Sequence, residues 1–132
     1  ARASAHVAEI TSKADMRRFL RGAGEQLAVV IVSADACEAC VHVFPTVLAL
    51  AKSMAGCVRF ARLISSTSEE TQQLVERCAV SQVPTFLFFK KGELKHRYAG
   101  SRRGELISQV MQVQASVSLE APLGGLRQRN RR

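Results

Sequence analysis

Two cysteines stand three residues apart in this chain, and they are the residues best able to carry out chemistry. Cys37 and Cys40 follow the apolar run 27–32 and precede a segment with helical periodicity. The free N–H groups and the dipole at a helix N-terminus stabilise negative charge, so Cys37 is expected to form a thiolate more readily than an isolated cysteine. Cys40, one turn later, is expected to be more buried and to resolve a mixed disulfide on Cys37. The spacing favours a redox dithiol.

The elements that must position this pair follow from hydrophobic periodicity. The run 27–32 predicts a central strand covered on both faces, and 58–64, 85–89 and 93–99 predict further strands, with a possible short strand at 7–10. Helices are predicted over 12–22, from Cys40 to about residue 54, from a hydroxyl cap at Ser66 or Thr67 through residue 78, and over 102–114. Crossover helices give parallel neighbours, and the Lys90-Lys-Gly92 turn gives an antiparallel hairpin. An α/β fold with a central mixed sheet sandwiched by helices is expected.

At about residues 6–114 the sequence resembles the thioredoxin family, and the resemblance implies the thioredoxin fold. The matching features are the strand 29–32, Cys37-Glu-Ala-Cys40, Pro45, Val83-Pro84 before the strand 85–89, and Gly100 before an amphipathic helix. The implied activity is thiol–disulfide exchange with client proteins through Cys37 and Cys40, without a bound cofactor. A thiol reductase or a small thiol must then recharge the pair.

The resemblance also implies which residues meet the client. The Val83-Pro84 bond is expected to be cis and to lie against the dithiol, so that the Val83 backbone can pair with an extended client segment. Ala99 and Gly100 would line the opposite side of this groove. The predicted substrate-binding residues are Ala36, Glu38, Ala39, Val83, Pro84, Ala99 and Gly100.

The chain departs from the family pattern at four places beside the dithiol. Ala36 replaces a tryptophan, and Glu38-Ala39 replaces Gly-Pro. Ile31 stands where the family has a buried aspartate, and Arg62 where it has a partly buried lysine. These departures keep a second hypothesis open: a non-catalytic or weakly redox-active accessory subunit of a larger organellar assembly, photosynthetic, respiratory or ribosomal.

Other cysteines and histidines allow a competing zinc site. Such a site would join Cys37 and Cys40 to two of Cys57, Cys78, His6, His42 and His96. Structural zinc normally uses a second closely spaced ligand pair, which this chain lacks, so no metal is predicted. Cys57 and Cys78 are interpreted as apolar fillers or peripheral thiols, and His42 as a surface histidine rather than a general base.

Length and charge set the organisation of the chain. Its 132 residues fit one domain, with 1–5 as a disordered remnant, 6–114 as the thioredoxin-like domain and 115–132 as a basic tail. The net charge of +8 is concentrated toward the ends, and the tail could dock on a larger protein complex. The longest apolar runs are too short to cross a membrane. The Ser/Ala/Arg-rich start resembles the remnant of an organellar transit peptide and favours the chloroplast stroma over the mitochondrial matrix.

Overall fold

The apolar run at residues 27–32 becomes the centre of a five-stranded sheet. The computed structural model describes the backbone of residues 6–130 and the side chains of residues 6–118. The elements are β1 (Val7–Ile10), α1 (Lys13–Ala23), β2 (Leu27–Ser33), α2 (Glu38–Ser53), β3 (Val58–Ile64), α3 (Glu69–Arg77), β4 (Thr85–Lys90), β5 (Glu93–Ala99) and α4 (Arg103–Asn130). The expected remnant at residues 1–5 lies outside the described residues.

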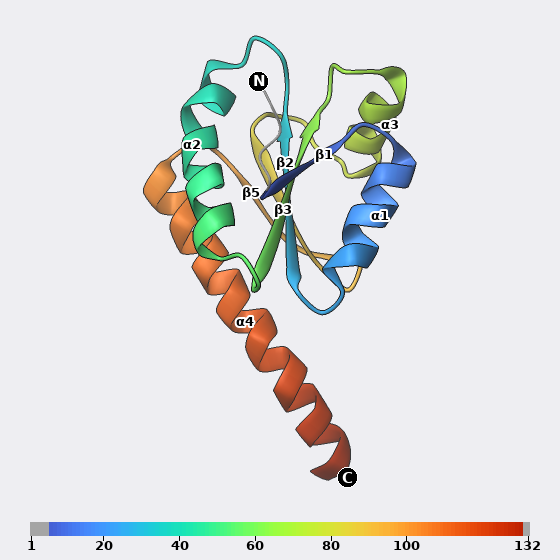
Figure 1. Cartoon of the computed structure of the whole chain (residues 1–132), viewed down its shortest axis with the longest axis vertical. Coiled ribbons are helices and arrows are strands. Elements are labelled where there is room, and N and C mark those ends of the chain that lie inside the picture. The colour runs from blue at the N-terminus through green and yellow to red at the C-terminus, as the bar shows by residue number, and fades with distance from the viewer. Residues whose placement is uncertain (1–5, 131–132) are drawn as a thin grey trace.

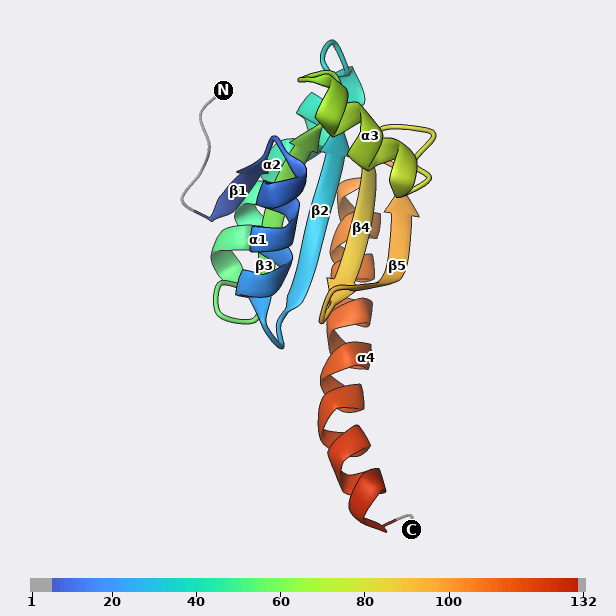
Figure 2. The same cartoon turned by 90° about the vertical axis from the view of Figure 1, so that its right-hand side faces the viewer.

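The sheet is mixed, as the sequence predicts. Its strand order is β1-β3-β2-β4-β5, with β1, β3 and β2 parallel to one another and β4 antiparallel to both of its neighbours. The predicted hairpin joins β4 to β5 through Lys91 and Gly92, both of which have positive φ, as a tight two-residue turn requires. Helices α2 and α4 cover one face of the sheet, and α1 and α3 cover the other (Figures 1 and 2).

Alternate residues of β2 serve the two faces, which explains why this strand is apolar throughout. Val29 and Ile31 pack on the face covered by α2 and α4, together with Phe86 and Phe88. Ala28, Val30 and Val32 pack on the face covered by α1 and α3. Because the strand is buried on both sides, its C-terminal end is a rigid support for the loop that carries Cys37.

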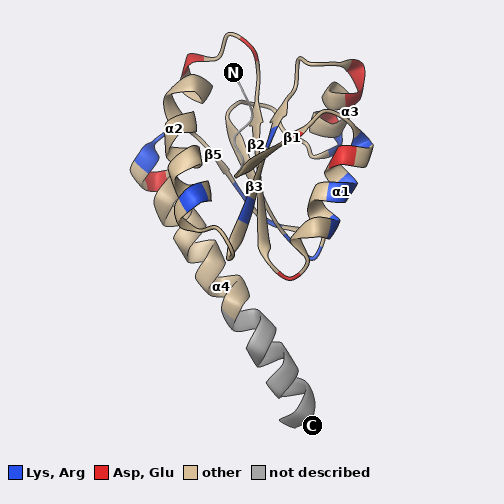
Figure 3. Cartoon of the chain, in the orientation of Figure 1, with Lys and Arg blue, Asp and Glu red and all other residues tan. Residues whose placement is uncertain are grey.

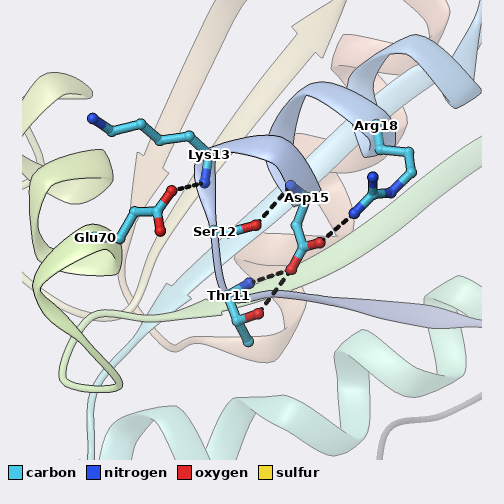
Figure 4. A network of polar contacts seen from close by, with 6 residues as sticks. All are labelled: Thr11, Ser12, Lys13, Asp15, Arg18 and Glu70. Carbon is cyan, nitrogen blue, oxygen red and sulfur yellow. Dashed lines mark hydrogen bonds and ion pairs between the residues drawn. The ribbon is translucent and has the colours of Figure 1, made fainter.

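A polar network begins α1 and ties it to α3 (Figure 4). The Ser12 hydroxyl accepts a hydrogen bond from the backbone N–H of Asp15, so Ser12 is the N-cap. The Thr11 backbone N–H and hydroxyl both donate to the Asp15 carboxylate, and these bonds lower the pKa of Asp15. The Glu70 carboxylate accepts from the Lys13 backbone N–H at 2.7 Å, linking the two helices.

The cap of α3 differs from the prediction. Ser68, rather than Ser66 or Thr67, forms a capping box with Thr71: each side chain accepts a hydrogen bond from the backbone N–H of the other residue. Thr71 also donates to the Ser68 carbonyl and is fully buried. Several hydroxyls precede this helix, and only the local backbone path selects the one that caps it.

Helix α4 is longer than the predicted 102–114. The helix continues to Asn130, through most of the segment 115–132 that the sequence analysis assigned to a basic tail. Val117 is one reason, because it lies seven residues after Val110 and extends the same apolar stripe into the core. The side chains of Arg127 and Arg129, and all of Arg131 and Arg132, lie outside the described residues, so the structure does not describe the basic tail's contacts.

A membrane-spanning helix is not found among the described residues, since none of their helices combines the necessary length and apolar character.

Candidate functional site

Cys37 and Cys40 meet at the start of α2, where they form a disulfide. Their Cα atoms are 5.3 Å apart. Cys37 is the N-cap of the helix, and its Sγ accepts a hydrogen bond of 3.1 Å from the backbone N–H of Cys40. Cys37 is partly buried and Cys40 is only 6% exposed. This is the asymmetry expected of an attacking and a resolving thiol.

The loop before the pair turns the chain sharply from β2 into α2. Ala36 has a φ of +56°, in the left-handed region that residues other than glycine and asparagine seldom adopt. Ala36 and Glu38 are exposed, whereas Ala39 is partly buried.

The proline loop lies at the same end of the sheet as the dithiol. Val32, at the end of β2, pairs with Thr85, and Thr85 pairs with Ala99. The peptide bond Val83-Pro84 just before Thr85 is cis, as the resemblance implies. Val83 is partly buried and Pro84 buried.

Gly100 lies at a position that favours glycine. Its backbone N–H donates to the Pro84 carbonyl at 3.1 Å, which joins two of the predicted groove residues. A Cβ atom at this position would lie 2.7 Å from the Tyr98 hydroxyl, and φ is +151°. Tyr98 and the backbone path therefore both favour glycine here, a reason the sequence alone does not show.

Behind Cys40 lies a mainly apolar cavity of about 330 Å³, whose wall includes Phe44 and Arg62. The Arg62 guanidinium lies 4.7 Å from the centre of the Phe44 ring and forms an ion pair of 2.7 Å with Glu9. Ile31, beside Arg62 in the β2–β3 register, is 1% exposed and offers no proton acceptor. Sequence reasoning identified Ile31 and Arg62 as departures but missed Glu9, whose partner is 53 positions away.

On the Cys37 side a second, more open cavity of about 620 Å³ is lined by Asp35, Cys37, Glu38, Val41 and His42, with Ala34 and Ala36. His42 is exposed, as predicted for a surface histidine. Asp35 and Val41 were not singled out from the sequence. Only their positions in the sequence could have indicated them: Asp35 lies two residues before Cys37, and Val41 lies four residues after it.

The other two cysteines lie away from the dithiol and are free. Cys57 is exposed and Cys78 partly buried, so the interpretation of peripheral thiols fits better than that of apolar fillers. Burial raises the pKa of the Cys78 thiol, and Arg97 and Arg77 offset part of that increase. Within residues 6–118, no three side chains of the metal-binding types come together.

Comparison with known proteins gives the same result at the level of family. The thioredoxin family model matches residues 7–113. The chain is 36% identical over 107 residues to "Thioredoxin-like protein CDSP32, chloroplastic" of Arabidopsis thaliana; the match covers 80% of this chain and 35% of that protein. The chain therefore spans about a third of the length of this relative.

Single-domain proteins match over nearly their whole length. Horse (Equus caballus) thioredoxin is 31% identical over 100 residues, which cover 76% of this chain and 91% of the horse protein. The crystal structure of Fasciola hepatica thioredoxin superposes with a TM-score of 0.73 at 25% identity, covering 80% of this chain and 98% of that one. The five-stranded mixed sheet with its four helices is the thioredoxin fold, and this chain belongs to the thioredoxin family.

Proposed function

We propose that this protein is a thiol–disulfide oxidoreductase that exchanges disulfides with client proteins through Cys37 and Cys40. The observation that carries the proposal is the disulfide between these two residues at the start of α2, in a chain of the thioredoxin family. The partly buried Cys37 is the attacking thiol, and the buried Cys40 is the resolving thiol.

In the proposed reaction the reduced pair transfers two electrons to a client. The Cys37 thiolate attacks one sulfur of the client disulfide, a mixed disulfide forms, and the first client sulfur leaves as a thiolate. Cys40 loses its proton and attacks Cys37 Sγ, which releases the second client sulfur as a thiolate. The client thiolates take up two protons, the client ends as a dithiol, and Cys37–Cys40 ends as a disulfide.

Helix α2 supports the first step. The Cys40 backbone N–H donates to the Cys37 sulfur in the disulfide, and the same donor can stabilise a thiolate there after reduction. Glu38 opposes this effect, because its negative charge follows Cys37 directly. The balance between the helix terminus and Glu38 sets how readily the thiolate forms.

We place the client in the groove formed by Val83 and Pro84 on one side and Ala99 and Gly100 on the other, with Ala36, Glu38 and Ala39 flanking the dithiol. Support comes from the strand register, which puts the segments around Thr85 and Ala99 at the end of the sheet where β2 leads into the cysteine loop. An extended client segment bound here would bring its disulfide to Cys37.

The proposal includes an electron donor, a location and a domain boundary. Each turnover leaves Cys37–Cys40 as a disulfide, so the pair must regain two electrons, and we propose that a thiol reductase supplies them. The Arabidopsis relative is named chloroplastic, which supports the chloroplast as the compartment, with the stroma as the expected site.

We further propose that residues 6–114 contain the whole redox site and that the Arg-rich end docks on a larger complex. No contact among the described residues favours the accessory-subunit alternative.

Reduction of insulin with dithiothreitol as electron donor tests the proposed function. The wild-type protein should accelerate insulin reduction, and Cys37→Ser should abolish the acceleration. The double variant Cys57→Ser/Cys78→Ser is the matched control and should keep wild-type activity, because those thiols lie outside the site. Wild-type protein that gives no more reduction than Cys37→Ser would contradict the proposal.

Trapping provides an independent test. Cys40→Ser removes the resolving thiol, so mixed disulfides between Cys37 and clients should accumulate in an extract. Mass spectrometry of the adducts would identify the sulfur that is linked. Adducts on Cys57 or Cys78 in place of Cys37 would contradict the assigned roles.

A further inference from the structure

We propose that the dithiol selects client proteins whose disulfide lies in a basic segment that also carries an apolar side chain. Asp35 and Glu38 recognise the positive charge, and Val41 packs against the apolar side chain. This inference rests on the proposed function, because it names the class of client for the same pair of cysteines. The site itself is the disulfide, and the neighbouring residues decide which segment reacts fastest.

The first observation is the position of these residues around Cys37. Asp35, Glu38 and Val41 all line the open cavity of about 620 Å³ into which Cys37 faces. Asp35 lies in the loop before the pair, Glu38 in the first turn of α2, and Val41 one turn further along. A client segment that reaches Cys37 from this side must pass these three side chains.

The second observation is that, within residues 6–118, neither carboxylate has a cationic partner. The ion pairs in that range join Glu9 to Arg62, Asp15 to Arg18, Glu25 to Lys91 and Glu93 to Lys95. No ion pair or hydrogen bond within that part of the chain engages the carboxylate of Asp35 or Glu38. Both residues are exposed and can accept a cation from a partner.

The surrounding charges do not cancel this negative potential. Arg62 lines the other cavity and is already held by Glu9. Arg102 and Arg103 follow Gly100 at the start of α4 and are absent from the wall of the cavity at Cys37. Figure 3 shows acidic residues in the loop before α2, at the start of α2 and at the start of α3, all at the end of the molecule that carries the dithiol.

The chemistry of the first step strengthens the preference. Reduction of the disulfide and ionisation of Cys37 add a third negative charge beside Asp35 and Glu38. A cationic client segment is attracted to this cluster and offsets the mutual repulsion of its charges as the thiolate attacks. An acidic client segment is repelled, so the same potential works against it.

The third observation is Val41, which is 73% exposed. Its backbone N–H donates to the Cys37 carbonyl, which fixes it one helical turn from the reactive cysteine. When a client covers this large apolar side chain, apolar surface leaves the water, and the complex between client and protein is stabilised. The matching client residue is therefore apolar and close to the client cysteine.

Three disulfide-bonded peptides of otherwise identical sequence test the inference, with lysine, glutamine or glutamate flanking the cysteines. The protein is reduced, freed of reductant and mixed with each peptide, and the second-order rate constant of a single turnover is measured. At low salt the lysine peptide should react about tenfold faster than the glutamate peptide. At about 0.5 M salt the ratio should fall to about twofold, because exposed charges are screened.

Variants assign the preference to the two carboxylates. In Asp35→Asn/Glu38→Gln the lysine-to-glutamate ratio at low salt should fall to about twofold. This ratio is independent of any change in the reactivity of Cys37, which affects all three peptides equally. The matched control is Glu25→Gln/Glu93→Gln, which should leave the ratio unchanged. It removes two exposed carboxylates away from the cysteine loop, one in the turn before β2 and one at the first residue of β5.

The apolar part is tested with Val41→Ser and a glutamine-flanked peptide that carries leucine or serine next to the cysteine. The wild type should prefer the leucine peptide about threefold, and the variant should lose this preference. Equal rates for the lysine and glutamate peptides, with the glutamine peptide still reduced, would overturn the inference and leave the proposed function intact. Failure to reduce even the glutamine peptide would overturn both.

Discussion

The four cysteines of this chain lie in two kinds of environment: two are at the start of a helix, and two are at or beyond the end of one. Cys37 and Cys40 lie at the N-terminus of α2, where a backbone N–H donates to the Cys37 sulfur. Cys57 follows the C-terminus of α2, and Cys78 is the C-cap of α3. At those ends the cysteines donate their own N–H groups, to the carbonyls of Met54 and Leu74.

The two environments differ in the electrostatic field that the neighbouring helix end supplies. A helix N-terminus carries partial positive charge and stabilises a thiolate, whereas the C-terminus carries partial negative charge and disfavours one. Burial adds to this difference at Cys78 by raising its pKa. One residue type therefore forms a disulfide at one element boundary and remains a free thiol at two others.

The largest expected effect is on alkylation rates. In the reduced protein at pH 7, Cys37 should react with iodoacetamide about 100-fold faster than Cys78, because it has the larger thiolate fraction. Mass spectrometry of peptides from a time course gives both rates in one experiment. Equal rates would show that the helix N-terminus does not activate Cys37.

The pH dependence of the same reaction tests the cause. The pKa of Cys78 is raised, so its thiolate forms only as the pH rises above the usual range for cysteine. Between pH 7 and pH 10 the rate at Cys78 should increase steeply and should still be rising at the upper end of this range, because its thiolate forms late. A rate at Cys78 that has already levelled off at pH 8 would contradict the raised pKa.

A smaller effect concerns stability. Cys37 is the N-cap of α2, so Cys37→Ala should be less stable than Cys37→Ser by about 1 kcal/mol, because serine can accept the Cys40 N–H bond and alanine cannot. Neither variant can form the disulfide, so the comparison isolates the cap. At Cys57, which caps no helix start, the alanine and serine variants should differ by less than about 0.5 kcal/mol in urea unfolding.

The smallest effect is at Arg97, whose guanidinium donates to the carbonyls of Cys78 and Ala79. Its charge lowers the pKa of Cys78 against the larger effect of burial. Arg97→Gln should therefore raise that pKa further and slow alkylation of Cys78 at pH 8.5 about twofold. Arg97→Lys keeps the charge and should slow the reaction less; a faster reaction in Arg97→Gln would reverse the assignment.

Local pattern was sufficient for most of the fold. The apolar run of β2, the alternation in β3 and the Lys-Gly turn between β4 and β5 predicted those strands and their hairpin to within a residue. These features depend on neighbours in the chain, and periodicity records them. The predicted end of α4 was wrong. Proline and glycine near residues 122–125 indicate a stop, but Val117 is buried in the core and the helix continues through this segment to Asn130.

By itself the sequence determined the thiol pair, its place before a helix and the order of the elements, because each depends on spacing over a few residues. Only the tertiary structure decided that Arg62 pairs with Glu9, that Tyr98 crowds position 100, and that Asp35 and Glu38 have no cationic partner within residues 6–118. Those contacts depend on how strands align and how helices pack on the sheet. Side chains distant in the chain meet only when the register of the folded sheet brings them together.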